Sequence, residues 1–256
     1  MEAYNMDIGK SFSYPFEDKQ WVSKLGLGAV ISLVPILNFA MTGYMIQIVR
    51  NLMNDVQEPL PNWDDLGKKF MDGLMLILAG LVYALPVIIL SCLPLSVITI
   101  PAIIASGNSD FQDVANAISG AGGVLLAGMT CLFVVYGLIL SVIFPAIYVL
   151  YAREGTFASC FKLREVFDII GKNAGAFFTA WGISLVAGLV VGLVASIVTG
   201  VLGLIPCLGW IVSIMITLGI GVYLSMIYSH LFGQFGRQAF GPLLPPTPAP
   251  LTDQPL

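Results

Sequence analysis

Three long stretches of this sequence carry no charged side chain. Residues 73–109, 114–152 and 173–236 contain no Asp, Glu, Lys or Arg. A bilayer core about 30 Å thick is crossed by about 20 apolar residues in an α-helix, so these stretches have room for four crossings. The pattern therefore predicts an all-α integral membrane protein with four full transmembrane helices. They are expected at about residues 73–93, 123–150, 174–204 and 210–236.

The remaining segments are predicted to complete one membrane domain over residues 1–240. Residues 1–24 form an interfacial arm, in which Pro15 interrupts any continuous helix and Trp21 anchors at the headgroup level. Residues 94–109 are expected to form a bent, partly interfacial segment on the outer side. The Pro-rich tail at 241–256 is predicted to be extended or disordered.

The first apolar run, residues 25–49, allows two interpretations because Pro35 interrupts it. It is either a single kinked span or a re-entrant hairpin. Basic residues collect on the cytoplasmic side of inner membranes, and a hairpin places all 11 Lys and Arg on one side. The hairpin is therefore favoured. Its tip must then be buried against protein or line a wet cavity, and Asn38 could bond local backbone groups there.

Residues 50–72 are predicted to form an inner loop with an amphipathic helix. Asn62 is its expected N-cap, and Asp64 and Asp65 are the acids near its start. Lys68 and Lys69 are expected to face water. An apolar stripe at helical spacing is expected to lie on the membrane. It consists of Trp63, Leu66, Phe70 and Leu74.

A second amphipathic helix is predicted within residues 153–172. One face is expected to be apolar and the other solvated, and its basic residues make only a weak case for contact with anionic lipid. The apolar face comprises Cys160, Leu163, Phe167 and Ile170. The polar face comprises Lys162, Glu165 and Asp168.

The last charge-free stretch holds two spans joined by a turn at 206–209, which begins at Pro206. Its first span contains Gly188 and Gly192 in a GxxxG pattern, which favours tight helix packing in a membrane. Residues 32–38 and 203–209 are alike over seven positions, with Pro35 and Pro206 at the same place. This likeness hints at an internal repeat.

Composition excludes a soluble domain. Hydrophobic residues make up 57% of the chain and charged residues 10%, against about 25% charged residues in soluble domains, and the mean hydropathy is +0.91. The four cysteines form no CxxC pair and are interpreted as small apolar residues in helix packing. We therefore expect a multi-pass protein of the lipid bilayer, and nucleic acid is not an expected partner.

Several strings in the first third of the chain resemble one known family. They are Phe12–Trp21, Pro35–Asn38, Gly43-Tyr44, Arg50-Asn51, and Glu58–Asp65 with Phe70 and Asp72-Gly73. The chain is similar there to the prokaryotic multi-spanning membrane family catalogued as domain of unknown function 4013. The resemblance implies a bacterial or archaeal protein of the inner membrane and carries no catalytic residues. Charge then places both termini in the cytoplasm.

No motif in the sequence indicates chemistry, so we expect no catalytic, cofactor or metal site and no enzyme activity. The long apolar runs contain no Asp, Glu, Lys or Arg, and their one histidine is His230. A hydrogen bond is enough to explain its presence there. Three hypotheses remain. The leading one is a structural or accessory subunit of a larger membrane assembly, with other membrane subunits as partners. The others are a small-molecule permease or channel, and a membrane-shaping or lipid-interacting protein.

Overall fold

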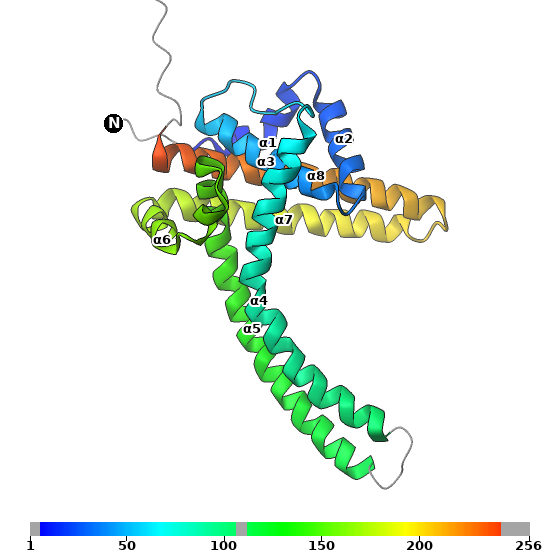
Figure 1. The fold of residues 1–256 in the computed structure, drawn as a ribbon. Helices are drawn as coiled ribbons and strands as arrows, with labels where there is room; N and C mark the ends of the chain where they lie inside the picture. Colours follow the sequence, from blue (N-terminus) through cyan, green and yellow to red (C-terminus); the bar gives the residue numbers. More distant parts are fainter. Residues whose placement is uncertain (1–5, 106–111, 242–256) are drawn as a thin grey trace, which may run out of the picture. The chain divides into compact units, whose positions relative to one another are not determined.

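The computed structural model describes residues 6–105 and 112–241, and regular structure in these ranges is helical (Figure 1). The predicted all-α class is confirmed. In chain order the helices are α1 (Ile8–Glu17), α2 (Trp21–Leu33), α3 (Asn38–Met53), α4 (Leu66–Ala105), α5 (Gln112–Glu154), the 3-10 helix η2 (Phe157–Phe161), α6 (Leu163–Lys172), α7 (Ala174–Leu202) and α8 (Leu208–Phe240).

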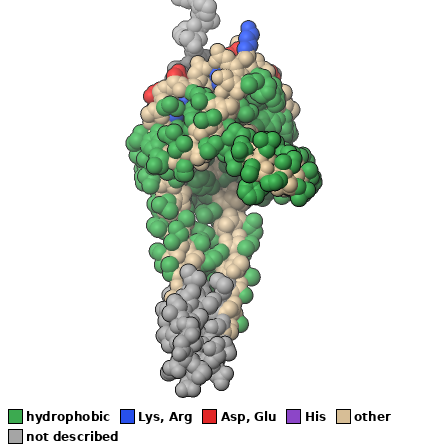
Figure 2. Space-filling view, turned by 90° about the vertical axis from the view of Figure 1, so that its right-hand side faces the viewer, with side chains coloured by type: hydrophobic (Ala, Val, Ile, Leu, Met, Phe, Trp, Pro, Cys, Tyr) green, Lys and Arg blue, Asp and Glu red, His purple; other side chains and the backbone are tan. Residues whose placement is uncertain are grey.

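Within residues 6–105 and 112–241, four helices are long and apolar enough to cross a membrane, as predicted. The qualifying segments are Leu66–Cys92, Ala127–Glu154, Ala174–Leu202 and Leu208–Phe240. Figure 2 shows hydrophobic side chains over much of one face, and the charged side chains visible there gather near the top of the view. The chain is thus a membrane-embedded protein.

Helix α4 differs from its prediction at the far end. It continues as one helix to Ala105 through Pro86, Pro94 and Pro101, so residues 94–105 belong to α4 and are not a separate segment. Proline removes one backbone donor, but such breaks are tolerated in membrane helices when neighbouring groups satisfy the freed carbonyl. Residues 106–111 of that segment, and the tail from 242 to 256, lie outside the described residues.

Two compact units make up the chain. One contains residues 1–77 and 145–256, and the other contains residues 78–144. In the second unit α4 and α5 run antiparallel, and the Tyr136 hydroxyl donates a hydrogen bond of 2.7 Å to the Tyr83 carbonyl. In the first unit α8 packs against α1, α2, α3 and α7. Fully buried Tyr44, Ile48 and Phe232 belong to the core of this unit.

Residues 21–53 form a hairpin of two helices, not one kinked helix. Helices α2 and α3 contact each other, and a Cβ on Gly28 would lie 3.5 Å from the Met41 sulfur on the opposite arm. The tip at 34–37 is exposed, so of the two expected alternatives, burial against protein or lining a wet cavity, burial against another part of this chain is not observed. Its backbone satisfies itself through bonds such as Asn38 N to Val34 O at 3.0 Å. The α3 start has no side-chain cap, so the backbone-bonding role expected for the Asn38 side chain is not observed.

The turn between α7 and α8 also satisfies its own backbone groups. Gly209 N donates to the Ile205 carbonyl at 3.1 Å across Pro206, and Leu204 is 81% exposed. Pro35 and Pro206 therefore both lie in exposed apolar tips between paired helices. The predicted likeness of residues 32–38 and 203–209 corresponds to two structurally similar breaks.

The arm before the hairpin is more ordered than predicted. Pro15 lies inside α1 and is buried, so it does not break the helix. It stands in the last turn, where only one hydrogen bond to a preceding carbonyl is lost. Trp21 begins α2, and its ring meets Phe16 edge-on at a centroid distance of 5.0 Å.

Candidate functional site

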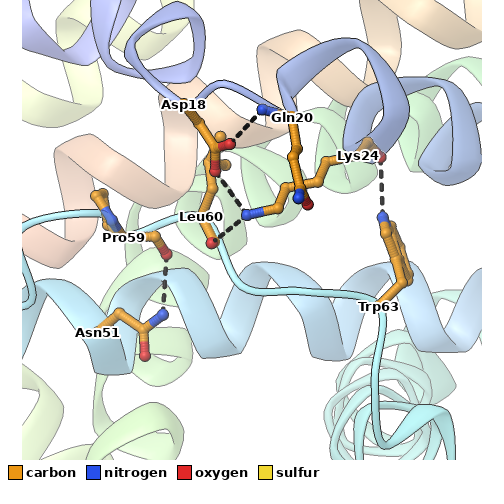
Figure 3. A network of polar contacts seen from close by, with 7 residues as sticks. All are labelled: Asp18, Gln20, Lys24, Asn51, Pro59, Leu60 and Trp63. Carbon is orange, nitrogen blue, oxygen red and sulfur yellow. Dashed lines mark hydrogen bonds and ion pairs between the residues drawn. The ribbon is translucent and has the colours of Figure 1, made fainter.

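A buried ion pair ties the start of the hairpin to the loop that follows it (Figure 3). The Lys24 Nζ donates to Asp18 Oδ2 at 2.6 Å and to the Leu60 carbonyl at 3.0 Å. Asp18 also accepts a hydrogen bond of 2.7 Å from the Gln20 backbone N–H. Asp18 is 7% and Lys24 8% exposed. Because both charges have partners, the cost of removing them from water is offset locally.

The environment of Asp18 shifts its pKa in two opposing directions. Burial raises the pKa, because it disfavours the charged carboxylate. The hydrogen bonds from Lys24 and from the Gln20 N–H, together with the Lys24 charge, lower it by more. The net pKa of Asp18 is below its ordinary value, so this carboxylate stays ionised in the folded protein.

Trp63 joins the same loop to both arms of the hairpin. Its indole Nε1 donates to the Lys24 carbonyl on α2 at 2.9 Å, and its ring stacks on Tyr44 of α3 at 4.3 Å with an interplanar angle of 14°. Asn51 of α3 donates to the Pro59 carbonyl at 2.9 Å. Sequence analysis placed Trp63 on a membrane-facing helix, and this is wrong, because Trp63 lies in the loop before α4.

The start of α4 differs from its prediction. The helix begins at Leu66, and Asp65 precedes it with φ +47° and accepts from the Lys68 N–H at 3.4 Å, so Asn62 is not the N-cap. Lys68 is exposed as expected, but Lys69 is only 4% exposed. The Lys69 ammonium donates to the Asp64 carbonyl and lies 3.2 Å from Asp64 Oδ1, so this acid draws it away from water.

A second polar cluster links α3 with the near ends of α4 and α5. Arg50 contacts both Asp72 carboxylate oxygens, at 2.5 and 3.3 Å, and its Nε donates to the Ala152 carbonyl at 2.9 Å. The Tyr151 hydroxyl donates to Asp72 Oδ1 at 3.2 Å. Sequence reasoning missed this cluster, because its members are separated by 22 and 79 residues.

A third cluster fixes α1 on α8. Gln234 accepts from the Asp7 N–H at 2.7 Å and donates to the Asp7 carbonyl at 3.0 Å, which sets the orientation of its amide. Its Nε2 lies 2.8 Å from His230 Nδ1, and the Ser11 hydroxyl lies 2.9 Å from the same atom. His230 Nδ1 therefore accepts, and the ring proton is on Nε2. Tyr14 stacks on the ring at 4.3 Å.

Gly188 and Gly192 do not pack tightly against another helix of this chain. A Cβ on either residue would meet no atom within 4 Å. Close approach occurs instead between α3 and α4, where a Cβ on Gly73 would lie 2.9 Å from the Gly43 nitrogen. The signal was present in the sequence as the strings Gly43-Tyr44 and Asp72-Gly73, which are separated too widely to form a spacing motif.

These clusters consist of paired charges and satisfied hydrogen bonds, an arrangement that holds helices in place. In the described ranges, no three or more His, Cys, Asp or Glu side chains gather in a way that could hold a metal ion. Cys160 is buried, and burial raises its pKa to about 11, so its thiol stays protonated and is a poor nucleophile.

Comparison with known families gives a match over much of the chain. The model of the family described as "Protein of unknown function (DUF4013)" matches residues 27–200. No curated protein and no solved structure matches the chain.

Proposed function

Since this chain belongs to the DUF4013 family and is embedded in a membrane, we propose that it is a structural or accessory subunit that docks on another membrane protein through α7. In lipid, apolar surface alone does not drive helices together, and small residues that let two backbones approach are the usual contact. Helix α7 offers such residues without using them inside this chain.

The open glycines of α7 carry this proposal. Gly188 and Gly192 lie about one turn apart, with space beside both, and Leu189 between them is 73% exposed. Where the chain packs its own helices closely, glycines stand at the crossing, as Gly43 and Gly73 do. The same kind of surface on α7 would accept a helix of a partner subunit.

Leucine at both glycines tests the proposal. Because no atom of this chain lies within 4 Å of either Cβ position, and Leu favours a helix over Gly, Gly188→Leu/Gly192→Leu should leave the melting temperature in detergent unchanged or raise it. Proteins that co-purify with the wild type from native membranes in mild detergent should be lost. Val190→Leu/Val194→Leu, on the opposite side of α7, is the matched control and should retain them. A double Gly variant that keeps the same partners contradicts the proposal.

We propose further that the protein lies in a prokaryotic inner membrane with both termini in the cytoplasm. The support is the α2–α3 hairpin. An arm that turns back on itself allows all 11 Lys and Arg to lie on one side of the bilayer.

A lipid-interacting or membrane-shaping role is a second candidate, favoured by the exposed apolar tip of α2–α3. Ile36 there is 66% exposed and Leu37 46%. Tubulation of liposomes by the purified protein would support it, and vesicles that stay smooth would argue against it. Two of the described pockets, one lined by Phe12 and residues 182–191 and the other between 86–90 and 132–139, have almost wholly apolar linings and give no support to the permease alternative.

A further inference from the structure

Four apolar side chains on η2 and α6 are partly exposed. We call this set the aromatic edge. It consists of Phe157 (39% exposed), Phe161 (38%), Leu163 (40%) and Phe167 (56%). Sequence analysis placed Leu163 and Phe167 on the same face as Cys160 and Ile170. The structure separates the two pairs, because Cys160 is fully buried and Ile170 is 9% exposed.

Helix α6 already has a buried face, so the aromatic edge is not needed to hold the helix on the protein. Val166, Ile169 and Ile170 recur at three- and four-residue spacing and face the core. At about 100° per residue, Phe167 and Glu165 lie on opposite flanks of this face, about 160° apart, and Arg164 lies on the far side of the helix. The aromatic edge therefore requires a second apolar environment.

The short connection between α6 and α7 identifies that environment. Helix α6 ends at Lys172, α7 begins at Ala174, and α7 is a candidate membrane span from its first residue. A helix one residue away from a span lies at the level where the chain enters the bilayer. The first turns of α7 carry Phe178, 49% exposed, whose ring meets Trp181 edge-on at 6.4 Å. Aromatic residues gather at this depth in membrane proteins.

The charged side chains beside the aromatic edge also fit the level at which the chain enters the bilayer. Lys162 pairs with Glu154 at 2.9 Å, and Lys172 pairs with Asp168 at 2.6 Å. In the part of the chain that the structure describes, Arg164 is exposed and forms no ion pair. It precedes Phe167 by three residues on the side of α6 away from the core. A cation in that place is suited to a lipid phosphate.

We propose that the aromatic edge of η2 and α6 is inserted at the boundary between headgroups and acyl chains, with Arg164 bound to an anionic lipid headgroup. This surface is separate from the α7 glycines, and it takes lipid where those would take a protein helix. Interfacial helices bind in this way, through an apolar side that enters the bilayer and cations at its rim.

Spin labels at two positions of the full chain test the insertion. Cys92, Cys131 and Cys207 are replaced by Ser, and buried Cys160 is kept after a check that it takes up no label. Phe167→Cys and the control Glu165→Cys are then labelled separately in bilayer nanodiscs containing anionic lipid. Collision with oxygen, which partitions into lipid, is compared with collision with a water-soluble nickel complex.

The label at 167 should show a severalfold higher ratio of oxygen to nickel collisions than the label at 165. Equal ratios at 165 and 167 would show that the two sides of α6 share one environment, and shielding of 167 from both reagents would mean that protein covers it. Either result overturns the proposal. The label at 167 should also sit deeper when anionic lipid is present than in neutral nanodiscs, and Arg164→Gln should remove that difference. A depth independent of lipid charge overturns the role of Arg164.

Discussion

Gly43 of α3 lies directly against Lys69 of α4, so that a Cβ on Gly43 would overlap the Lys69 carbonyl oxygen and stand 2.7 Å from the Lys69 Cα. At Gly73 the reciprocal contact is made with Phe39 and with the Gly43 nitrogen. The two helices therefore cross with backbone against backbone. Because backbone atoms cannot rotate out of the way, this crossing tolerates only glycine at both positions.

We expect Gly43→Ala and Gly73→Ala each to lower the free energy of unfolding by about 1–3 kcal/mol or more, the usual cost of overpacking. Unfolding in detergent, followed by heat or denaturant, measures this change. Gly26→Ala is the matched control, since Gly26 is an exposed helical residue whose Cβ would meet nothing within 4 Å. It should be neutral or stabilise by up to about 1 kcal/mol. Equal effects at the three positions would contradict the close crossing.

Removing the Lys24 ammonium should destabilise the protein, because Asp18 and the Leu60 carbonyl would both lose their buried donor. Lys24→Met is expected to cost about 2–3 kcal/mol. Adding Asp18→Asn in the same chain should recover part of this loss, because no unpaired charge then remains. Lys19→Met, at an exposed neighbouring residue, is the control. If the double variant loses as much stability as the two single variants added together, Lys24 and Asp18 are not coupled.

The lowered pKa of Asp18 predicts a defined dependence of stability on pH. A carboxyl whose pKa is lower in the folded than in the unfolded protein contributes its stabilisation fully above the unfolded pKa, about 3.9. The contribution is lost as the pH falls through the lower, folded pKa. The stability difference between wild type and Asp18→Asn should therefore be largest above about pH 5 and shrink below about pH 4. A difference that grows as the pH falls would reverse the sign and refute the assignment.

The hairpin predicts that residues before and after it share one side of the membrane. Lys10 and Gln57 line the same cavity of 310 Å³, together with His230 and Arg237. Lys10→Cys and Gln57→Cys, each in a background without other exposed cysteines, should react equally with an impermeant thiol reagent in sealed inverted vesicles. Labelling of only one of the two would show that residues 21–53 cross the bilayer.

The pattern of residues along the chain was enough to predict the long helices and the break at Pro35. The four long helices follow from stretches without charge, and the break at Pro35 follows from the missing backbone donor of proline. The hairpin was also favoured over a kinked helix, on the ground of charge. The long helices and the break depend on residues close in the chain, and the hairpin depends on the distribution of Lys and Arg along the whole chain, so all three can be predicted from one sequence.

The polar clusters could not be predicted. Some of their residues are distant from each other in the chain, and others lie at positions where the hydrophobic pattern predicts exposure to water. Lys69 was expected in water, since a lysine on an amphipathic helix normally faces it, but Asp64 supplies a carbonyl and a carboxylate beside it. His230 was expected to form a hydrogen bond, and its partner Ser11 is 219 residues away. The start of α4 was misplaced because Asp65 adopts a positive φ, which composition does not indicate.

The self-contained turns at Pro35 and Pro206 affect how the chain is assembled during synthesis. Each turn closes its own main-chain bonds and presents only apolar side chains, so neither has to wait for a later segment before it meets lipid. The backbone of the α2–α3 pair can thus be satisfied before α8, against which the pair finally rests, has been synthesised.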